Sequence, residues 1–360
     1  MITFHTPKNY GAVLQAFSLM VCLKTYSADV KVIDFNTPHL RSLYPLYTKP
    51  ATIKQAAHWA LNAGYLGKKK RKYEKFEKFV REKLDLTQRY ESFAELEKTP
   101  PAADVYVTGS DQVFNPNRIE EERQAFYLHF GTETAKRISY AASFGVKSVP
   151  ENRRQEISGY LNAFSSLSVR EESGKVIVRE LSGRSAQEVL DPVFLNDRNF
   201  WRNVAEPYPV GDEPYLLYYR LMSSKQSDDA VRRAADEKKL KLIVVTDGRL
   251  KLRADRVLRD VGPEELLYLL DHAQYVATDS FHGVAFSLLF EKQFLFVDFN
   301  EKLADRALNL MKKAGADHCA GLNGNDGNAV LDYWAVKQNL LPLISSSRKF
   351  LEDAVCEAKD

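Results

Sequence analysis

Short apolar runs alternate with longer segments whose apolar residues recur at helical spacing along most of the chain. In the first half, strands are predicted at residues 2–4, 30–35, 104–109, 137–143, 167–171 and 186–191. Helical spacing separates several of them, for example over residues 11–26. Strands that alternate with helices form βαβ units and a mostly parallel sheet, so the first half is predicted to be an α/β domain.

A turn-rich stretch, AEPYPVGDEP at residues 205–214, interrupts this alternation. A second alternation follows it, with predicted strands at residues 215–219, 240–247, 274–279 and 294–299. We therefore predict two Rossmann-like α/β domains that face a central cleft, at residues 1–205 and 214–345, and a C-terminal helix at residues 346–360. A length of 360 residues suits two domains. The first apolar run is short for a strand, so we expect the start to be clipped by a few residues.

Residues 50–99 read as a helical insertion in the first domain. Within it, Tyr73, Phe76, Val80 and Leu84 form an apolar stripe under a basic face. That face consists of Lys68, Lys69, Lys70, Arg71 and Lys72. A solvated face of a surface helix explains this pattern, and contact with an anionic membrane surface is the functional alternative.

The composition, with 44% hydrophobic and 28% charged residues, is that of a soluble globular protein. A net charge of +3 gives no reason to expect nucleic-acid binding. Cys22, Cys319 and Cys356 are far apart and form no Cys-x-x-Cys pair, which fits a reducing cytoplasm. No apolar run approaches the ~20 residues that cross a bilayer, and no export signal is recognisable.

Polar and small residues follow the predicted strands. Ligands of open α/β sheets bind at the carboxyl ends of the strands, so these residues are candidates for a shared site. They are Asn9, Ser110, Asp111, Ser143, Arg170, His282 and Lys302. Local structure is the alternative: Asp111 and Ser280 are suited to capping the helices that follow them, and Gly11 to a turn.

Arg170 and His282 carry the most chemistry among these residues. The planar guanidinium of Arg170 suits a carboxylate or a phosphate, although Glu171 or Glu172 could pair with it instead. His282 stands at a predicted helix start, where unpaired N–H groups favour an anion, and Gly283 would let that anion approach closely. The sequence thus predicts an anionic substrate beside a proton donor.

Common cofactor and metal motifs are absent. The chain has no G-x-G-x-x-G, no G-x-x-x-x-G-K-[ST], no H-E-x-x-H and no Asp-x-Asp pair. We therefore expect no metal.

Six segments occur in order from Asn9 to about residue 315: NYGAVLQAFSL, VTGSDQVFNPN, RISYAASFG, SVREESG, VLDPVFL and ATDSFHGVAFSLLF. Together they resemble the polysaccharide pyruvyl transferase family. The resemblance implies a GT-B-like fold, phosphoenolpyruvate as donor with no further cofactor, and a sugar in an intermediate of a bacterial capsule or exopolysaccharide as acceptor. It also implies an acceptor built on a lipid carrier, and hence a cytoplasmic enzyme that is peripheral at the inner face of the membrane.

The resemblance also implies roles for single residues. The family's arginine and histidine fall on Arg170 and His282, and Lys302 is a candidate for a lysine that some members carry. Ser280 stands where some members have an arginine, so Lys302 or Arg306 would supply that charge. The donor site would then consist of Asn9, Gly11, Ser280, Lys302 and Arg306, and the cleft or acceptor site of Ser110, Asp111 and Ser143.

This chemistry gives the two main candidates complementary tasks. Phosphoenolpyruvate carries about three negative charges at neutral pH, which Arg170 and Lys302 would neutralise. Ketal formation needs a proton on the enol carbon, which His282 would donate, while Arg170 would stabilise the departing phosphate. A nucleotide-sugar glycosyltransferase and a non-catalytic carbohydrate-binding protein are the alternative functions.

Overall fold

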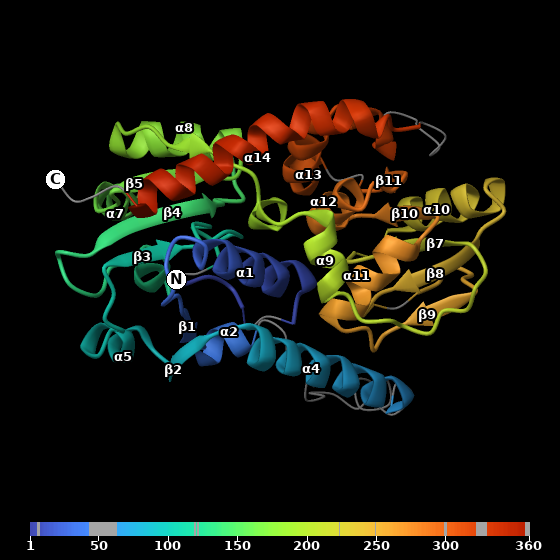
Figure 1. Ribbon diagram of the computed structural model, residues 1–360, viewed down its shortest axis with the longest axis horizontal. Helices are drawn as coiled ribbons and strands as arrows, with labels where there is room; N and C mark the ends of the chain where they lie inside the picture. The colour runs from blue at the N-terminus through green and yellow to red at the C-terminus, as the bar shows by residue number, and fades with distance from the viewer. Residues whose placement is uncertain are drawn as a thin grey trace. The chain divides into compact units, whose positions relative to one another are not determined.

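The computed structural model describes residues 1–5, 8–42, 63–118, 120, 122–222, 224–248, 250–298, 301–321 and 330–356, without the side chains of residues 63–65 and 301–303. The chain forms two compact units (Figure 1). Unit 1 consists of Met1–Tyr44, Val80–Asn196 and Pro342–Asp360, and unit 2 of Pro45–Phe79 and Asp197–Leu341. Each unit is described by itself below.

Unit 1 is built on parallel strands. The strands β3 (Val105–Thr108), β4 (Lys136–Ala142), β5 (Ser166–Val169) and β6 (Gln187–Glu188) form one sheet in that order. The strands β1 (Val32–Phe35) and β2 (Leu86–Tyr90) form a second parallel pair. Ile2 bridges to Thr108, and the Ile33 N–H donates to the Met1 carbonyl, so the N-terminal residues connect the two sheets.

Helices cover the strands of unit 1. They are α1 (Tyr10–Leu23), α2 (Pro38–Ser42), α5 (Phe93–Lys98), α6 (Arg123–Phe126), α7 (Glu151–Asn162), α8 (Glu172–Ser182) and the 3₁₀ helix η1 (Pro192–Leu195). Aromatic side chains fill much of the core between helices and sheet. The rings of Phe114 and Tyr127 stack at 4.3 Å, and Phe4 packs edge-on against Phe126 at 4.8 Å.

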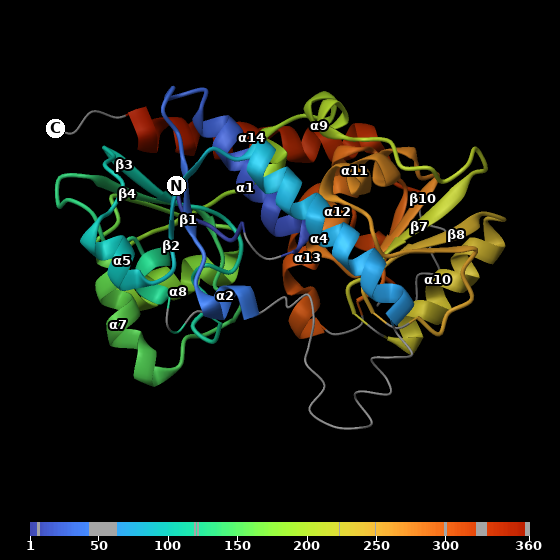
Figure 2. The same cartoon turned by 90° about the horizontal axis from the view of Figure 1, so that it is seen from below.

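Unit 2 contains one parallel sheet, with the strand order β11-β10-β7-β8-β9. These strands are β7 (Tyr215–Tyr219), β8 (Lys241–Val245), β9 (Arg256–Leu258), β10 (Tyr275–Thr278) and β11 (Phe294–Phe296). The central strands β7 and β10 are buried along their whole length. That burial is typical of a parallel sheet with helices on both faces, as Figure 2 shows.

Helices make up most of the remaining structure of unit 2. They are α9 (Arg198–Val204), α10 (Lys225–Glu237), α11 (Pro263–His272), α12 (Phe281–Leu289), α13 (Glu301–Ala314) and the 3₁₀ helix η2 (Asp317–Cys319). Two further helices, α4 (Ala63–Lys83) and α14 (Tyr333–Cys356), contribute residues to both units. The predicted α/β class and the two Rossmann-like halves of a GT-B-like protein are confirmed.

The division of the chain differs from the predicted one. The predicted insertion at residues 50–99 is split, because α4 as far as Phe79 belongs to unit 2 and β2 pairs with β1 in unit 1. Ion pairs explain the first assignment: Lys72 lies 2.7 Å from Asp247, and Lys75 lies 2.6 Å from Glu265. Residues 43–62, which include part of the predicted insertion, lie outside the described residues.

The boundary also falls earlier than the predicted turn at residues 205–214. Asp197 is the first residue of unit 2 in this part of the chain, because Trp201 is fully buried and packs edge-on against Phe286 at 5.1 Å. The C-terminal helix begins at Tyr333 rather than at residue 346, and residues 357–360 lie outside the described part. Among the described residues, no helix has the length and apolar character that crossing a membrane requires.

The packing of Trp201 can be tested by truncation. Trp201→Ala should lower the free energy of unfolding by ~3–5 kcal/mol, because it leaves a large cavity. Trp334, which is 72% exposed, provides the matched control, and Trp334→Ala should change that free energy by no more than ~0.5 kcal/mol. Urea denaturation followed by circular dichroism measures both, and equal losses would contradict the packing role of Trp201.

Candidate functional site

The carboxyl ends of β7 and β10 form the topological switch point of unit 2. These strands are neighbours, yet the chain continues from β7 to β8 on one side and from β10 to β11 on the other. Ligands of open α/β sheets bind at such a point. Residues 220–222 and 279–283 follow the two strands directly and therefore line this edge.

Asp279 joins the two segments at the switch point. Its Oδ1 accepts a hydrogen bond from the Leu221 N–H at 2.8 Å, and its Oδ2 accepts one from the Met222 N–H at 2.7 Å. Burial raises the pKa of the Asp279 carboxyl to about 6, although both N–H groups oppose the shift, and nearby Asp298 raises it further. Asp279 was not among the residues predicted from the sequence, although it follows β10 directly, as the predicted residues follow their strands.

Ser280 and His282 begin helix α12. The Ser280 hydroxyl accepts from the Gly283 N–H at 3.3 Å and thus caps the helix, which is the local role foreseen as the alternative for this residue. His282 is the second residue of the helix and is half-buried, with its ring edge-on to Phe281 at 5.1 Å. The histidine therefore lies at the switch point of unit 2.

Gly283 has a packing role. A Cβ atom at this position would lie 2.2 Å from Thr278 Oγ1 and 2.7 Å from Thr278 Cβ. Close contact between α12 and β10 thus explains the glycine, rather than the predicted approach of a ligand.

Lys302 and Arg306 both belong to α13. Lys302 falls in the first turn of this helix, but its side chain lies outside the described residues. Arg306 is half-buried one turn later.

Arg170 follows β5 in unit 1 and is buried in a network of polar side chains. Its Nη1 donates to Asp191 Oδ2 at 2.6 Å and to the Ser110 hydroxyl at 3.3 Å, and that hydroxyl also donates to Asp191 at 3.0 Å. Asp191 is therefore its closest acidic partner, because the foreseen Glu171 lies 4.0 Å away. Burial alone would lower the pKa of Arg170, but the charges of Asp191, Asp111 and Glu171 outweigh it and raise the pKa.

Ser143 contributes to a second buried contact at this edge. Its hydroxyl donates to Glu171 Oε1 at 2.8 Å, and the same oxygen accepts from the N–H groups of Phe144 at 3.0 Å and Gly145 at 3.3 Å. Ser110 and Ser143 are both fully buried. Their hydroxyls thus hold together the loops that follow β3, β4 and β5.

Strained backbone marks the same edge. Asp111 has φ +74° and Ala141 has φ +52°, a region in which residues other than glycine are uncommon. The two positions are close, because Asp111 forms a parallel bridge with Ala142. Such strain clusters at functional sites and supports this edge as one. Asp111 is also half-buried, so part of it reaches the surface.

Asn9 and Gly11 have local roles at the start of α1. The Asn9 side chain caps the helix by accepting from the N–H groups of Gly11 at 2.9 Å and Ala12 at 3.4 Å. Gly11 is buried in the first turn. Helix capping accounts for both residues.

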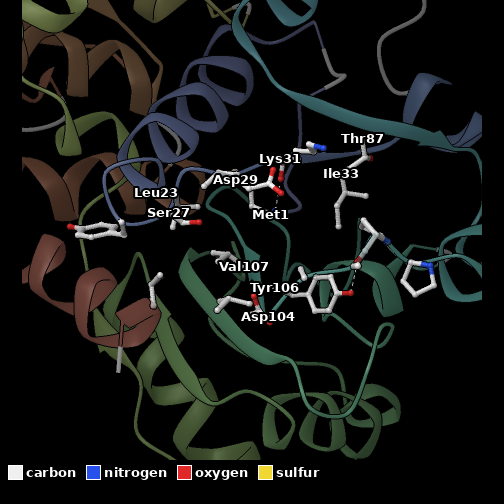
Figure 3. A pocket seen from close by; sticks show the side chains of 18 of the residues that line it. Met1, Leu23, Ser27, Asp29, Lys31, Ile33, Thr87, Asp104, Tyr106 and Val107 are labelled. Carbon is white, nitrogen blue, oxygen red and sulfur yellow. Dashed lines mark hydrogen bonds between the residues drawn. The ribbon is translucent and has the colours of Figure 1, made fainter. Parts of the chain in front are cut away.

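A cavity of about 850 Å³ lies at the opposite, amino-terminal edge of unit 1 (Figure 3). Lys31 and Asp104, which directly precede β1 and β3, line it together with Met1 and Tyr106. This edge is remote from the strand ends at which open α/β sheets bind ligands, so the cavity is distinct from the candidate site. Throughout the described part of the chain, no group of three His, Cys, Asp or Glu side chains could hold a metal ion.

The basic face of α4 is only partly exposed. Lys72 is 4% exposed and lies 2.7 Å from Asp247, and burial lowers its pKa. It is therefore wrong to count Lys72 among the exposed basic residues. Arg71 lies 3.0 Å from Asp260, while Lys70 is exposed. The predicted apolar stripe is confirmed at Phe76 and Leu84, which are buried.

Residues 9–301 match the family described as polysaccharide pyruvyl transferase. The chain belongs to this family. The matched region contains all six motifs and both edges described above, and it identifies the chain as a transferase. No curated protein matches the chain.

Solved structures give only distant likenesses to this family member. UDP-GlcNAc 2-epimerase from Neisseria meningitidis is 9% identical with a TM-score of 0.48, over 96% of this chain and 95% of that one. S. aureus MnaA, solved with UDP, is 13% identical with a TM-score of 0.47, over 99% and 90%. ADP-heptose LPS heptosyltransferase II from E. coli is 11% identical with a TM-score of 0.35, over 96% and 98%. At these values the likenesses do not identify a substrate.

The raised pKa of Asp279 predicts a pH-dependent effect on stability. The native state holds this proton up to about pH 6, whereas an unfolded chain loses it at about pH 4. Stability therefore falls as the pH rises between these two values. The stability of the wild type relative to Asp279→Asn should therefore fall by about 1–3 kcal/mol between pH 4 and pH 7. Urea denaturation at both pH values measures this change. Asp229→Asn, at an exposed position of α10, serves as control, and an equal change there would refute the assignment.

Proposed function

We propose that this member of the family transfers the enolpyruvyl group of phosphoenolpyruvate to two hydroxyls of one sugar and so forms a cyclic pyruvate ketal. The acceptor would be a sugar in an intermediate of a bacterial surface polysaccharide. The observation that carries the proposal is His282 at the switch point of unit 2, within a chain that matches the family over residues 9–301.

Several groups suit the anionic donor. Phosphoenolpyruvate has about three negative charges, one on the carboxylate and nearly two on the phosphate. The first turn of α12 provides a positive end of a helix beside His282. Lys302 and Arg306 of α13 are proposed as the cations that compensate for Ser280. Asn9 and Gly11 are proposed to contribute indirectly, by ordering the start of α1, because the Gly11 N–H donates to the Asn9 side chain there.

The proposed reaction begins when His282 donates a proton to C3 of the enol. A sugar hydroxyl then attacks C2, and the C2–O bond to phosphate breaks as a second hydroxyl closes the ring. Of the two hydroxyl protons, one replaces the proton that His282 gave and the other leaves on phosphate. Arg170, which Asp191 orients and keeps charged, is proposed to stabilise the departing phosphate.

The acceptor is proposed to approach the strained edge of unit 1. Asp111 is the candidate for direct contact because it is only half-buried. Ser110 and Ser143 are fully buried and would instead position Arg170 and the loop after β4.

The test is incubation with phosphoenolpyruvate and candidate glycans. Mass spectrometry then identifies the products, and an assay measures the inorganic phosphate that is released. Ketal addition supports the proposal, whereas sugar addition from a nucleotide sugar would indicate a glycosyltransferase.

His282→Asn should lower turnover by ~10²–10⁴-fold, because a general acid is lost, while donor binding is retained. His272→Asn, at an exposed position of α11, is the control. Wild-type turnover in His282→Asn would refute the role of His282.

A lipid-linked acceptor would bring the enzyme to the inner face of the cytoplasmic membrane. Lys68, Lys69 and Lys70 are proposed to contact anionic lipid there. The other two residues of the predicted basic face are left out, because Lys72 is buried and Arg71 pairs with Asp260. Each basic residue near a membrane contributes about 1 kcal/mol, so replacing all three with Gln should weaken binding to anionic liposomes by roughly 100-fold. Cosedimentation at low and physiological salt measures this effect, and activity on a soluble acceptor should not change.

The control for the membrane experiment is a variant in which three exposed lysines elsewhere, Lys225, Lys239 and Lys251, become Gln. It removes the same charge from a different part of unit 2. Equal weakening in the two triple variants would show an effect of net charge alone.

A further inference from the structure

A histidine and a buried glutamate meet at the carboxyl edge of unit 1. His39 belongs to α2, which follows β1 after Asn36 and Thr37. Glu122 belongs to the segment between β3 and β4. The N-terminal residues run parallel to both strands, because the Met1 N donates to the Lys31 carbonyl, the Ile33 N–H donates to the Met1 carbonyl, and Ile2 forms a parallel bridge with Thr108. The end of β1, which α2 follows, therefore lies on the same side as the end of β3, which Asp111 follows. In Figure 2, α2 lies beyond the end of β1.

The contact between them has the geometry of an oriented imidazole. His39 Nδ1 lies 3.0 Å from Oε1 and 2.9 Å from Oε2 of Glu122. The Glu122 side chain is 1% exposed, whereas that of His39 is 34% exposed. An ionised carboxylate only accepts hydrogen bonds, so Nδ1 carries the hydrogen and Nε2 is the basic nitrogen of the neutral ring.

Thr37 fixes the carboxylate in place. Its hydroxyl donates to Glu122 Oε1 at 2.6 Å and accepts from the Leu40 N–H at 3.1 Å. Both Glu122 and the loop before α2 are therefore ordered by bonds that do not involve His39 Nε2.

We propose that His39 is the general base for an acceptor hydroxyl and that Glu122 is its positioning residue. The inference rests on the proposed function. In the step concerned, a lone pair of the sugar oxygen forms the bond to C2 of the donor, and the hydroxyl proton moves to His39 Nε2. The imidazolium then returns this proton to the departing phosphate. A carboxylate that holds the other nitrogen keeps the correct tautomer and stabilises the imidazolium.

A second observation at the same loop points to a hydroxyl-bearing ligand. Asn36 is 8% exposed, and its Oδ1 has no hydrogen-bond partner among the described residues. Such an acceptor is uncommon in a folded protein, because its desolvation is uncompensated. A sugar hydroxyl bound beside α2 would supply the missing donor.

The contact could instead serve only to fix α2 to the segment before α6, and two variants separate these roles. His39→Gln keeps an N–H donor for Glu122 but has no second basic nitrogen. His39→Ala opens a space that added imidazole can fill. His129, an exposed histidine of unit 1, gives the control His129→Gln.

We expect His39→Gln to fold like the wild type and to lose ~10²–10⁴-fold in turnover, while the Kd for phosphoenolpyruvate is unchanged. Imidazole should restore ketal formation in His39→Ala and leave the wild type unaffected. Nitrogen-15 NMR of the His39 ring should show the Nδ1–H tautomer in the wild type and a tautomer mixture in Glu122→Gln, with lower turnover in that variant.

The possible failures are distinguishable. If the wild type forms ketal and His39→Gln turns over like His129→Gln, the role of His39 is refuted and the proposed function stands. A turnover loss in His39→Ala that imidazole does not restore, with a folded protein, would also refute a base and leave a structural role. If the wild type forms no ketal, the proposed function fails, and the base with it.

Discussion

The parallel pairing of the strands in the described part of the chain is the constraint on which the other features depend. Strands such as β7 and β10 are buried on both faces, so polar side chains are placed at their ends instead. Every carboxyl end lies on the same side of its sheet, which concentrates charged and hydrogen-bonding groups at one edge of each unit. Asp279 and His282 in unit 2 and Arg170 and Asp111 in unit 1 all owe their location to this geometry.

Charge placed at a buried edge must be paired, and both units meet this requirement with an arginine. Arg170 bonds to Asp191 at 2.6 Å, and Arg220 bonds to Asp228 at 2.8 Å, with both arginines almost fully buried. Removing one partner of such a pair leaves an uncompensated charge and commonly costs several kcal/mol. The two ion pairs therefore fix the loops that follow β5 and β7.

The pattern of the chain predicted most strands and the strand ends that carry the site. It failed where contacts between distant segments decide the outcome. No local feature shows that Lys72 pairs with Asp247 or that β2 pairs with β1, so the insertion was placed on one domain only. The same limit applies to His39, whose significance depends on Glu122, 83 residues further along the chain. Asp279, by contrast, could have been predicted from the sequence, because it lies at the end of a predicted strand as the other candidate residues do.

By itself, the sequence determined the α/β class, the order of the elements and the membership of the family. The spacing of hydrophobic residues and the six motifs can each be recognised within a short stretch of the chain. It also placed Arg170, Asp111 and His282 at strand ends, since that position follows from the order of elements alone. Only the tertiary structure decided which of these side chains are buried, which partner each one has and why Gly283 is a glycine. Those outcomes depend on the packing of α12 on β10 and on charge pairs between segments far apart in the chain, which no local pattern encodes.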